Sequence, residues 1–246
     1  MIKFVGGNFV SGIASTGTYD VSLTELTGGI DTAARVGDFV VAHTAYSAGT
    51  GSVSSTGVSG SDTNLYTNLY KAAVAETIDP SACVAYKYLT ADADLASVTV
   101  FGTVTAGYGR IGMVSVWRGV DSVTPLIASQ SGANSGTNSP LPVFAAVTPT
   151  IPGSVVLEVG TCSLTSAVQL VVGANYTNAV GCLHIGSGTA KSGIAGRIGY
   201  RFWPGYAAET PASMTGPTDT NAEGFIAHSL VLNPVANKSV FTTSNT

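Results

Sequence analysis

The feature of this sequence that most constrains its fold is an internal repeat whose copies lie 110 to 116 residues apart. Five short matches occur in the same order in the two halves of the chain. Any one match means little, but five in one order indicate two copies of one structural plan. The matched pairs are Gly37-Asp38-Phe39-Val40-Val41 with Gly153-Ser154-Val155-Val156-Leu157, Tyr66-Thr67-Asn68 with Tyr176-Thr177-Asn178, Tyr86-Lys87-Tyr88 with Tyr200-Arg201-Phe202, Ala96-Ser97-Val98-Thr99 with Ala212-Ser213-Met214-Thr215, and Gly109 and Ile111 with Gly224 and Ile226.

The repeat predicts how the chain is organised. The pattern in each half predicts a set of strands with one apolar face. Because neither half can bury its apolar face by itself, we expect the two halves to pack against each other as two sheets. We therefore predict an all-β fold, a jelly-roll-like β-sandwich made from two internally repeated halves with few or no helices. Residues 1–234 form this single sandwich, with halves 1–125 and 140–234, and residues 235–246 form a C-terminal tail or arm. Two tandem small sandwiches are the alternative.

Composition favours strands over helices and points to an assembly. Charged residues make up only 10% of the chain, against about 25% in an ordinary soluble domain. Exposed amphipathic helices need many charges on their wet face, whereas a surface of Ser, Thr and Gly suits strands and tight turns. A positive mean hydropathy with so few charges also favours a surface that is partly covered by other subunits.

Charge and hydropathy argue against two classes of partner. The net charge is −4 and the 10 Lys and Arg residues are scattered, whereas a nucleic-acid-binding surface needs clustered basic residues. No apolar run reaches the length of about 18 residues that a membrane-spanning helix requires. The segment Met1-Ile2-Lys3-Phe4-Val5-Gly6-Gly7 lacks the apolar region and cleavage site of a signal peptide, so we expect no cleavable export signal.

Strand-like stretches alternate with turn signals along the chain. Strands are predicted around residues 39–42, after the turn signal at residues 36–38, and around residues 83–89, 97–104 and 112–117. Two stretches rich in Gly, Ser, Thr and Asn, residues 47–62 and 129–139, are predicted loops at the ends or edges of the sandwich. Residues 64–76 contain the one predicted short helix, although Tyr66, Leu69 and Tyr70 fit a strand equally well.

The repeated pattern resembles a known family of proteins. In each half a Gly-Asp or Gly-Ser turn leads into an apolar strand, followed by Tyr-Lys or Tyr-Arg and a stretch of small residues. The halves close on Trp117-Arg118-Gly119-Val120-Asp121, with Thr124-Pro125 after it, and on Ser229-Leu230-Val231-Leu232-Asn233-Pro234. Over residues 2–234 this pattern resembles bacteriophage virion β-sandwich proteins of the head-decoration, cement or tail-fibre type. The resemblance implies a structural role without an active site, and the two long loops depart from it. Trp117 is predicted to lie in the core.

Residues that carry metal or nucleophile chemistry are few and scattered. The histidines are His43, His184 and His228. His43 and His228 are expected at strand edges, as hydrogen-bonded and partly buried imidazoles, and no metal-binding motif contains them. No Gly-x-Ser-x-Gly elbow holds a serine nucleophile. Cys83, Cys162 and Cys182 are interpreted as small buried hydrophobes, and the spacing leaves a Cys162–Cys182 bridge open.

Carboxylate pairs suited to glycoside hydrolysis are not evident. The closest pair is Asp92 and Asp94, in a predicted turn where Asp bonds to nearby backbone. Asp62, Glu76 and Glu158 lie elsewhere along the chain. The Asp92–Asp94 stretch also lacks the ligand spacing of a calcium loop. We therefore predict no catalytic, cofactor-binding or metal-binding residues, no cofactor and no enzyme activity, with a polysaccharide depolymerase as the least favoured function.

Aromatic and tail residues are the candidates for interaction. Phe202, Trp203 and Tyr206 lie in a stretch interrupted by Pro and Gly, where exposed rings typically anchor interfaces. The alternative is a loop that folds these rings over the sandwich end. Val240 and Phe241 form the one strong apolar pair of the tail. This tail is either a frayed terminus or an arm that adds to the sheet edge of a neighbouring subunit.

The leading prediction for function is a bacteriophage virion structural protein, a capsid decoration or cement subunit that stabilises or covers the head through protein–protein contacts. The alternative is a tail-fibre or receptor-binding adhesin module whose loops contact a host-surface glycan or protein. The expected partners are the chain itself, as a homo-oligomer such as a trimer, and other virion proteins such as the major capsid protein. Neither nucleic acid nor membrane is expected, and the expected location is the virion, assembled in the bacterial host cytoplasm.

Overall fold

The computed structural model describes most of the chain. The described residues are 1–13, 18–47, 57–60, 66–73, 80–101, 108–131, 142–164, 167–186, 192–203, 207–216 and 223–236. Three antiparallel sheets and one short 3-10 helix, η1 (Asp92–Leu95), make up their regular structure. None of the described helical structure is long and apolar enough to cross a membrane.

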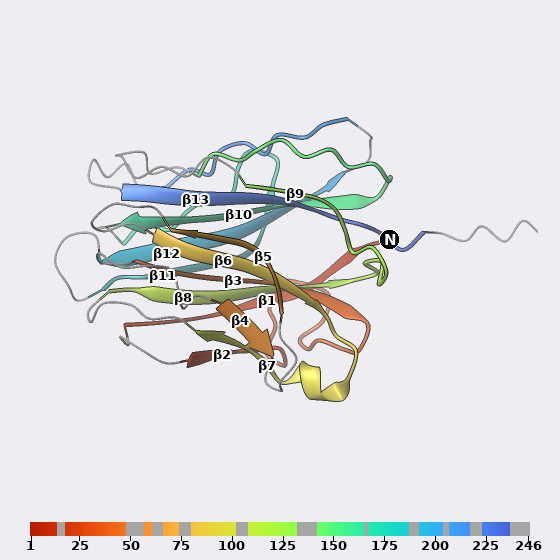
Figure 1. The fold of residues 1–246 in the computed structure, drawn as a ribbon, viewed down its shortest axis with the longest axis horizontal. Coiled ribbons are helices and arrows are strands. Elements are labelled where there is room, and N and C mark those ends of the chain that lie inside the picture. Colours follow the sequence, from red (N-terminus) through yellow and green to blue (C-terminus); the bar gives the residue numbers. More distant parts are fainter. Residues whose placement is uncertain are drawn as a thin grey trace, which may run out of the picture.

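Two five-stranded sheets pack face to face (Figure 1). The first sheet contains, in order across it, β1 (Lys3–Gly12), β8 (Arg110–Arg118), β3 (Asp38–Ser47), β6 (Pro80–Tyr88) and β5 (Thr67–Ala73). The second contains β11 (Thr177–His184), β12 (Gly193–Trp203), β10 (Ser154–Leu164), β13 (Glu223–Leu232) and β9 (Leu126–Ser131). The predicted all-β sandwich is confirmed, whereas the strand order does not establish jelly-roll connectivity.

The two sheets follow the same plan. Strand β3 is the central strand of the first sheet and lies between β8 and β6. Strand β10 is the central strand of the second sheet and lies between β13 and β12. The flanking strands carry repeat motifs that follow the central strand in the sequence. Aligned through the repeat, the orders β1-β8-β3-β6-β5 and β9-β13-β10-β12-β11 are equivalent strand by strand. Each sheet therefore takes all its strands from one part of the chain, and the second sheet begins at β9, before residue 140.

A glycine turn opens the central strand of each sheet. Gly37 has φ +91° and Gly153 has φ +81°, a left-handed conformation that glycine adopts without steric cost. Each glycine N–H donates to a carbonyl at the end of the neighbouring strand. The Gly37 N–H donates to the Leu89 carbonyl at 2.8 Å, and the Gly153 N–H donates to the Trp203 carbonyl at 3.3 Å. The sequence repeat is thus also a repeat of backbone conformation and hydrogen bonding.

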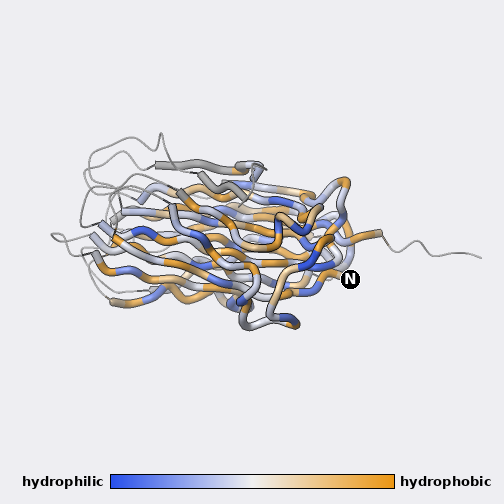
Figure 2. The backbone as a smooth tube through the Cα atoms, turned by 90° about the horizontal axis from the view of Figure 1, so that it is seen from below, coloured by the Kyte–Doolittle hydropathy of each residue, from blue (hydrophilic) through white to orange (hydrophobic). Residues whose placement is uncertain are grey.

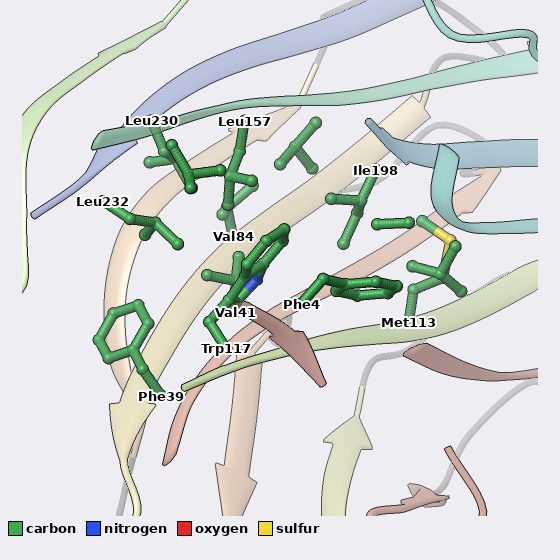
Figure 3. Packing of buried hydrophobic residues seen from close by; sticks show 14 of the residues in the cluster. Phe4, Phe39, Val41, Val84, Met113, Trp117, Leu157, Ile198, Leu230 and Leu232 are labelled. Atoms are coloured by element: carbon green, nitrogen blue, oxygen red, sulfur yellow. The ribbon is translucent and has the colours of Figure 1, made fainter. Parts of the chain in front are cut away.

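The main apolar interior lies between the two sheets (Figure 3). Because side chains alternate along a strand, Phe39 and Val41 of β3 face this interior, whereas Val40 faces the other side of the sheet. Trp117 is 0% exposed, and its indole N–H donates to Ser115 Oγ at 3.0 Å. The predicted core position of Trp117 is confirmed.

The outer face of the first sheet is covered by a third sheet. It contains β2 (Thr18–Ser22), β7 (Ser97–Phe101) and β4 (Gly57–Gly60). Figure 1 shows it on the side of the first sheet that faces away from the second. Val21 and Val98 pack there against Val40 and Val114, which form the outer apolar face of the first sheet.

The outer face of the second sheet is covered by segments that lie outside the named strands. Phe144, Leu170 and Met214, from three such segments, pack against Cys162 and Leu164 of β10. As a result β3 and β10 are buried along their whole length. The fold is a stack of four layers, and Figure 2 shows hydrophobic stretches along the strands.

Of the two interpretations left open for residues 64–76, the strand is the one that forms, and two predicted loops are wrong in part. Residues 67–73 form strand β5 instead of a helix, because Leu69 faces the interior between the sheets and Tyr66 faces the opposite side. The predicted loop 47–62 contains strand β4, and the predicted loop 129–139 begins inside strand β9. Residues 48–56 and 132–139 lie outside the described residues.

We predict that the two sheets unfold as one unit, because they share one interior. Replacing Trp203 with Phe leaves Trp117, in the first sheet, as the one tryptophan. In that background Leu157→Ala, in the second sheet, should lower the free energy of unfolding by about 2–5 kcal/mol and shift the Trp117 fluorescence transition equally. An unchanged Trp117 transition in urea, with only the circular dichroism shifted, would contradict a shared core.

Candidate functional site

An aromatic column forms one end of the sandwich interior, where β1 begins and β12 ends. Tyr200 and Phe202 lie on the inner-facing side of β12, because even-numbered residues of this strand face the first sheet. The Phe4 ring lies 5.0 Å from Trp117 and 5.3 Å from Tyr200, between ring centroids. Phe202 stacks edge-on against Tyr200 at 5.7 Å. The rings therefore run from the buried core out to the surface.

At the surface this column becomes an open pocket of about 380 Å³, here called the aromatic pocket. Its lining residues are Met1, Ile2, Lys3, Phe4, Gly28, Gly29, Ile30, Tyr200 and Phe202. Three of them are large apolar side chains with high exposure: Met1 at 85%, Ile30 at 58% and Phe202 at 47%. The pocket thus offers aromatic and aliphatic surface, with Lys3 as its one charged side chain.

One wall of the aromatic pocket is a glycine turn held against β1. The Ile30 N–H donates to the Phe4 carbonyl at 3.2 Å, which brings this turn beside the first strand. Gly28 has φ +78°. A Cβ on Gly29 would lie 2.1 Å from the Val5 carbonyl oxygen. Only glycine therefore fits at position 29, where the backbone of the turn lies against the backbone of β1. This close contact places Ile30 at the rim of the aromatic pocket.

Most charges near this end are paired with one another. Arg118 donates to both carboxylate oxygens of Asp38, at 2.8 and 2.9 Å, and Asp31 pairs with Arg35 at 2.7 Å. The hydrogen bonds to Asp38 raise the pKa of Arg118 above its ordinary value. Among the described residues, no carboxylate lies within ion-pair distance of Lys3. A partner that covers this end therefore has few unpaired charges to desolvate.

A second, smaller pocket of about 270 Å³ adjoins the first. Its lining residues are Met1, Ile151, Pro152, Gly153, Pro234, Val235 and Ala236. Met1 lines both pockets. The N-terminus and the last described residues of the chain therefore meet beside the aromatic pocket.

The predicted interaction residues are only partly brought together. Phe202 and Trp203 belong to β12 instead of a loop, because β12 pairs with β10 as far as Trp203 and Ser154. Phe202 lines the aromatic pocket, whereas Trp203 faces the outer side, with Arg201 4.8 Å from its ring centroid. Tyr206, Val240 and Phe241 lie outside the described residues.

The carboxylates considered for catalysis have structural contacts. Asp94 accepts hydrogen bonds from Lys87 Nζ and from the backbone N–H of Thr90 at 3.1 Å. Burial raises the pKa of Asp94, but the bonds from Lys87 and the backbone outweigh it, so the pKa lies below its ordinary value. The predicted turn at Asp92 is the 3-10 helix η1. Asp62 and Glu76 lie outside the described residues.

Two histidines lie inside the sandwich, not at strand edges as predicted. His43 of β3 and His228 of β13 are buried, and both follow the alternation of inward-facing residues. His228 Nε2 lies 2.7 Å from Ser129 Oγ. The pKa of each imidazole is lowered to about 4, chiefly by burial. For His43, a hydrogen bond with the Cys83 backbone opposes this lowering and repulsion from His228 adds to it.

Glu158 is a buried carboxyl on the outer face of β10. Its Oε1 accepts a hydrogen bond from the Gly173 N–H at 2.9 Å. Burial raises the pKa of Glu158 to about 7, although the bond from Gly173 opposes this effect. A Cβ on Gly199 would lie 2.4 Å from Oε1, so the glycines leave the space that the carboxyl fills.

Cysteines and acidic residues do not group into a metal centre in the described part of the chain. No three His, Cys, Asp or Glu side chains there lie close enough together to hold a metal ion. Cys83, Cys162 and Cys182 are free and buried, so the Cys162–Cys182 bridge is not formed. Burial raises the thiol pKa of Cys162 and of Cys182 to about 12.

Comparison with known proteins returned no match. No protein-family model matches the chain, and neither a curated protein nor a solved structure is significantly similar to it. The resemblance to phage virion sandwiches therefore stays a prediction.

We predict that Gly29→Ala is the more damaging of two matched glycine substitutions. The new methyl group would collide with the Val5 carbonyl, so the loss of stability should exceed about 2 kcal/mol. Gly37→Ala meets no atom within 4 Å and suffers only the left-handed backbone penalty of about 1–2 kcal/mol. Urea unfolding measures the free energy of unfolding of both variants. Equal losses of stability would contradict the close contact between Gly29 and Val5 that forms this wall of the pocket.

We expect acid to destabilise the fold through the interior histidines. Their pKa is about 4 in the folded protein and ordinarily 6.5, so the stability contributed by the neutral rings is complete above pH 6.5. It is lost as the pH falls towards 4, on the order of 3 kcal/mol for each ring. Glu158 has the opposite effect, because its raised pKa stabilises the fold below pH 4.5 and this contribution is lost as the pH rises through about 7.

Single substitutions separate the two opposing contributions. Between pH 7.5 and pH 4.5, Glu158→Gln should lose more stability than the unsubstituted protein, and His43→Gln should lose less. The exposed Glu25 provides a control, since Glu25→Gln should keep the original profile. Urea unfolding at several pH values measures the effect, and identical profiles for all four proteins would refute it.

Proposed function

We propose that this chain is a structural, non-enzymatic subunit of a bacteriophage virion surface that attaches to neighbouring subunits through its aromatic end. The observation that carries the proposal is the aromatic pocket, with Met1, Ile30 and Phe202 exposed around it. A contiguous exposed apolar surface with a polar surround is typical of an interaction site.

The chemistry of this end suits a protein partner. Phe202 is a half-exposed ring held by Tyr200, and rigid aromatic anchors in pockets supply much of the binding energy at interfaces. Arg118 and Asp38 already satisfy each other, so covering them leaves no buried unpaired charge. Lys3 offers one site for a carboxylate or carbonyl from the partner.

The more specific roles stay separate proposals. A decoration or cement subunit covers the head through such contacts, and this is the role we favour. The tail-fibre alternative depends on the predicted loops 47–62 and 129–139, of which large parts lie outside the described residues. The favoured role therefore rests on the aromatic end alone.

We predict that the protein is a component of purified phage particles and that Phe202 anchors it there. Loss of an interface anchor worth about 2 kcal/mol corresponds to about 30-fold weaker binding. Phe202→Ser should therefore lower the number of copies per particle strongly. The matched control is Phe9→Ser, because Phe9 is also an exposed ring, at 53%, and does not line the pocket.

Quantitative mass spectrometry of gradient-purified particles measures both variants. Absence of the unsubstituted protein from particles would end the virion proposal. Equal copy numbers for the Phe202→Ser and Phe9→Ser variants would show that the aromatic end is not the attachment surface.

A further inference from the structure

The outer face of the second sheet carries a layer of irregular segments, here called the outer cover, which consists of residues 142–147, 170–173 and 209–215. Figure 1 shows green and blue members of this layer on the side of the second sheet that faces away from the first. Isolated β-bridges join the segments to one another, at Val147 with Glu209 and at Val171 with Thr215. The outer cover is thus a unit that packs on the sheet through side chains, as Leu170 does against β10.

Two polar side chains of the second sheet bond to the backbone of the outer cover. Glu158 of β10 accepts a hydrogen bond from the Gly173 N–H at 2.9 Å. Ser229 of β13 donates from its Oγ to the Ala145 carbonyl at 2.9 Å, and it is the neighbour of Glu158 across the ladder. Glu158 is the titratable member of this pair, so the contact between sheet and cover contains a group that gains or loses a proton.

The first copy of the repeat has no carboxyl at this position. By the repeat alignment, Ala42 of β3 is the counterpart of Glu158, and it packs in the apolar cluster beneath the third sheet. The partner across the ladder differs as well, because Ala42 pairs with Ala85 whereas Glu158 pairs with Gly199. The same layered plan therefore closes over an alanine on one side and over a carboxyl on the other. The carboxyl is a feature of the second half and not a requirement of the fold.

The surroundings of Glu158 favour the neutral form of its carboxyl. The residue is 0% exposed, and among the described residues its Oε2 has no hydrogen-bond partner. An ionised carboxylate is costly in such a place, because too few hydrogen bonds replace the water it has lost. Burial accordingly raises the pKa of Glu158 to about 7, against the opposing effect of the bond from Gly173.

The charged groups near Glu158 bond to other residues. Arg201 of β12 donates to Glu209 of the outer cover at 3.1 Å, and Tyr176 donates to the same carboxylate at 3.2 Å. Arg197 of β12 donates to two side-chain amide oxygens, each at 2.7 Å. Apart from Glu209, the outer cover contains no titratable residue. None of these contacts places a positive charge on the Glu158 carboxylate.

We propose that Glu158 is a proton-dependent latch for the outer cover: the neutral carboxyl allows the cover to close on the second sheet, and ionisation releases the cover while the two sheets stay packed. The inference goes beyond the proposed function and does not rest on it.

The direction of the pH effect follows from the two environments of Glu158. Its pKa is about 7 beneath the closed cover and ordinarily 4.5 in water, so the closed state holds the proton more tightly. The proton therefore favours closure fully below pH 4.5, and this contribution is lost as the pH rises through about 7. Between pH 5.5 and pH 8 the ratio of open to closed cover should rise about 25-fold.

The three cysteines report on the three apolar layers separately. Cys162 packs beneath the outer cover, Cys182 lies between the two sheets and Cys83 lies beneath the third sheet. All three are free thiols. Reaction with N-ethylmaleimide, followed by peptide mass spectrometry, gives the rate at each thiol. Division by the rate of reduced glutathione under the same conditions removes the effect of pH on the thiol itself.

The relative rate at Cys162 should rise about 25-fold between pH 5.5 and pH 8, whereas the rates at Cys182 and Cys83 should not rise. Glu158→Gln, which has a neutral side chain of similar size, should abolish the rise at Cys162. The matched control is Glu25→Gln, because Glu25 is exposed, and this variant should keep the rise.

Three results would overturn the proposal. A Cys162 rate that does not rise with pH would show that the cover stays closed. A parallel rise at Cys162 and Cys182 would show that the whole sandwich opens, and this comparison in the unsubstituted protein decides even where the Glu158→Gln chain does not fold. A rise that persists in Glu158→Gln would assign the effect to another group. None of these results bears on attachment through the aromatic end, so the two proposals fail separately.

Discussion

The apolar contact between the inner faces of the two sheets is the constraint on which the rest of the structure depends. Phe39 and Val41 on one side meet Leu157 and Leu230 on the other within a single buried cluster. Each face is kept dry only by its counterpart, so two copies of one strand plan are stabilised as a pair. The same contact fixes the aromatic end, because Tyr200 lies in the inward-facing row of β12.

Burial on the outer faces gives a second reason for the unusual composition. Strands β3 and β10 are buried on both sides, and such strands consist of near-continuous apolar residues. A four-layer stack thus uses many apolar and few charged residues within one copy of the chain. The low charge alone therefore does not indicate assembly; the exposed apolar side chains around the aromatic pocket are the specific indication.

The two sheets could be predicted because the central strand of each has a recognisable local sequence pattern. Gly37 and Gly153 are needed for the same left-handed turn, and alternation places apolar residues after each of them. Strand β5 was left open between strand and helix, because its apolar residues lie on two different faces and a short segment with this pattern fits either element. Phe202 was assigned to a loop because of the following Pro and Gly, although pairing with β10 extends the strand through Trp203.

The candidate site could not be predicted as a whole, because it joins three distant segments. Met1, Ile30 and Phe202 share no local pattern. The ring contact between Phe4 and Tyr200 and the glycine turn held against β1 bring them together. The alternation of Tyr200 and Phe202 was the one available signal, since it places both rings on the inner face. The charges at this end are mostly satisfied within the chain, because Arg118 at the end of β8 donates to Asp38 at the start of β3. In the interface that we propose, apolar contact would therefore supply most of the binding energy, and Lys3 would add specificity for the group placed beside it.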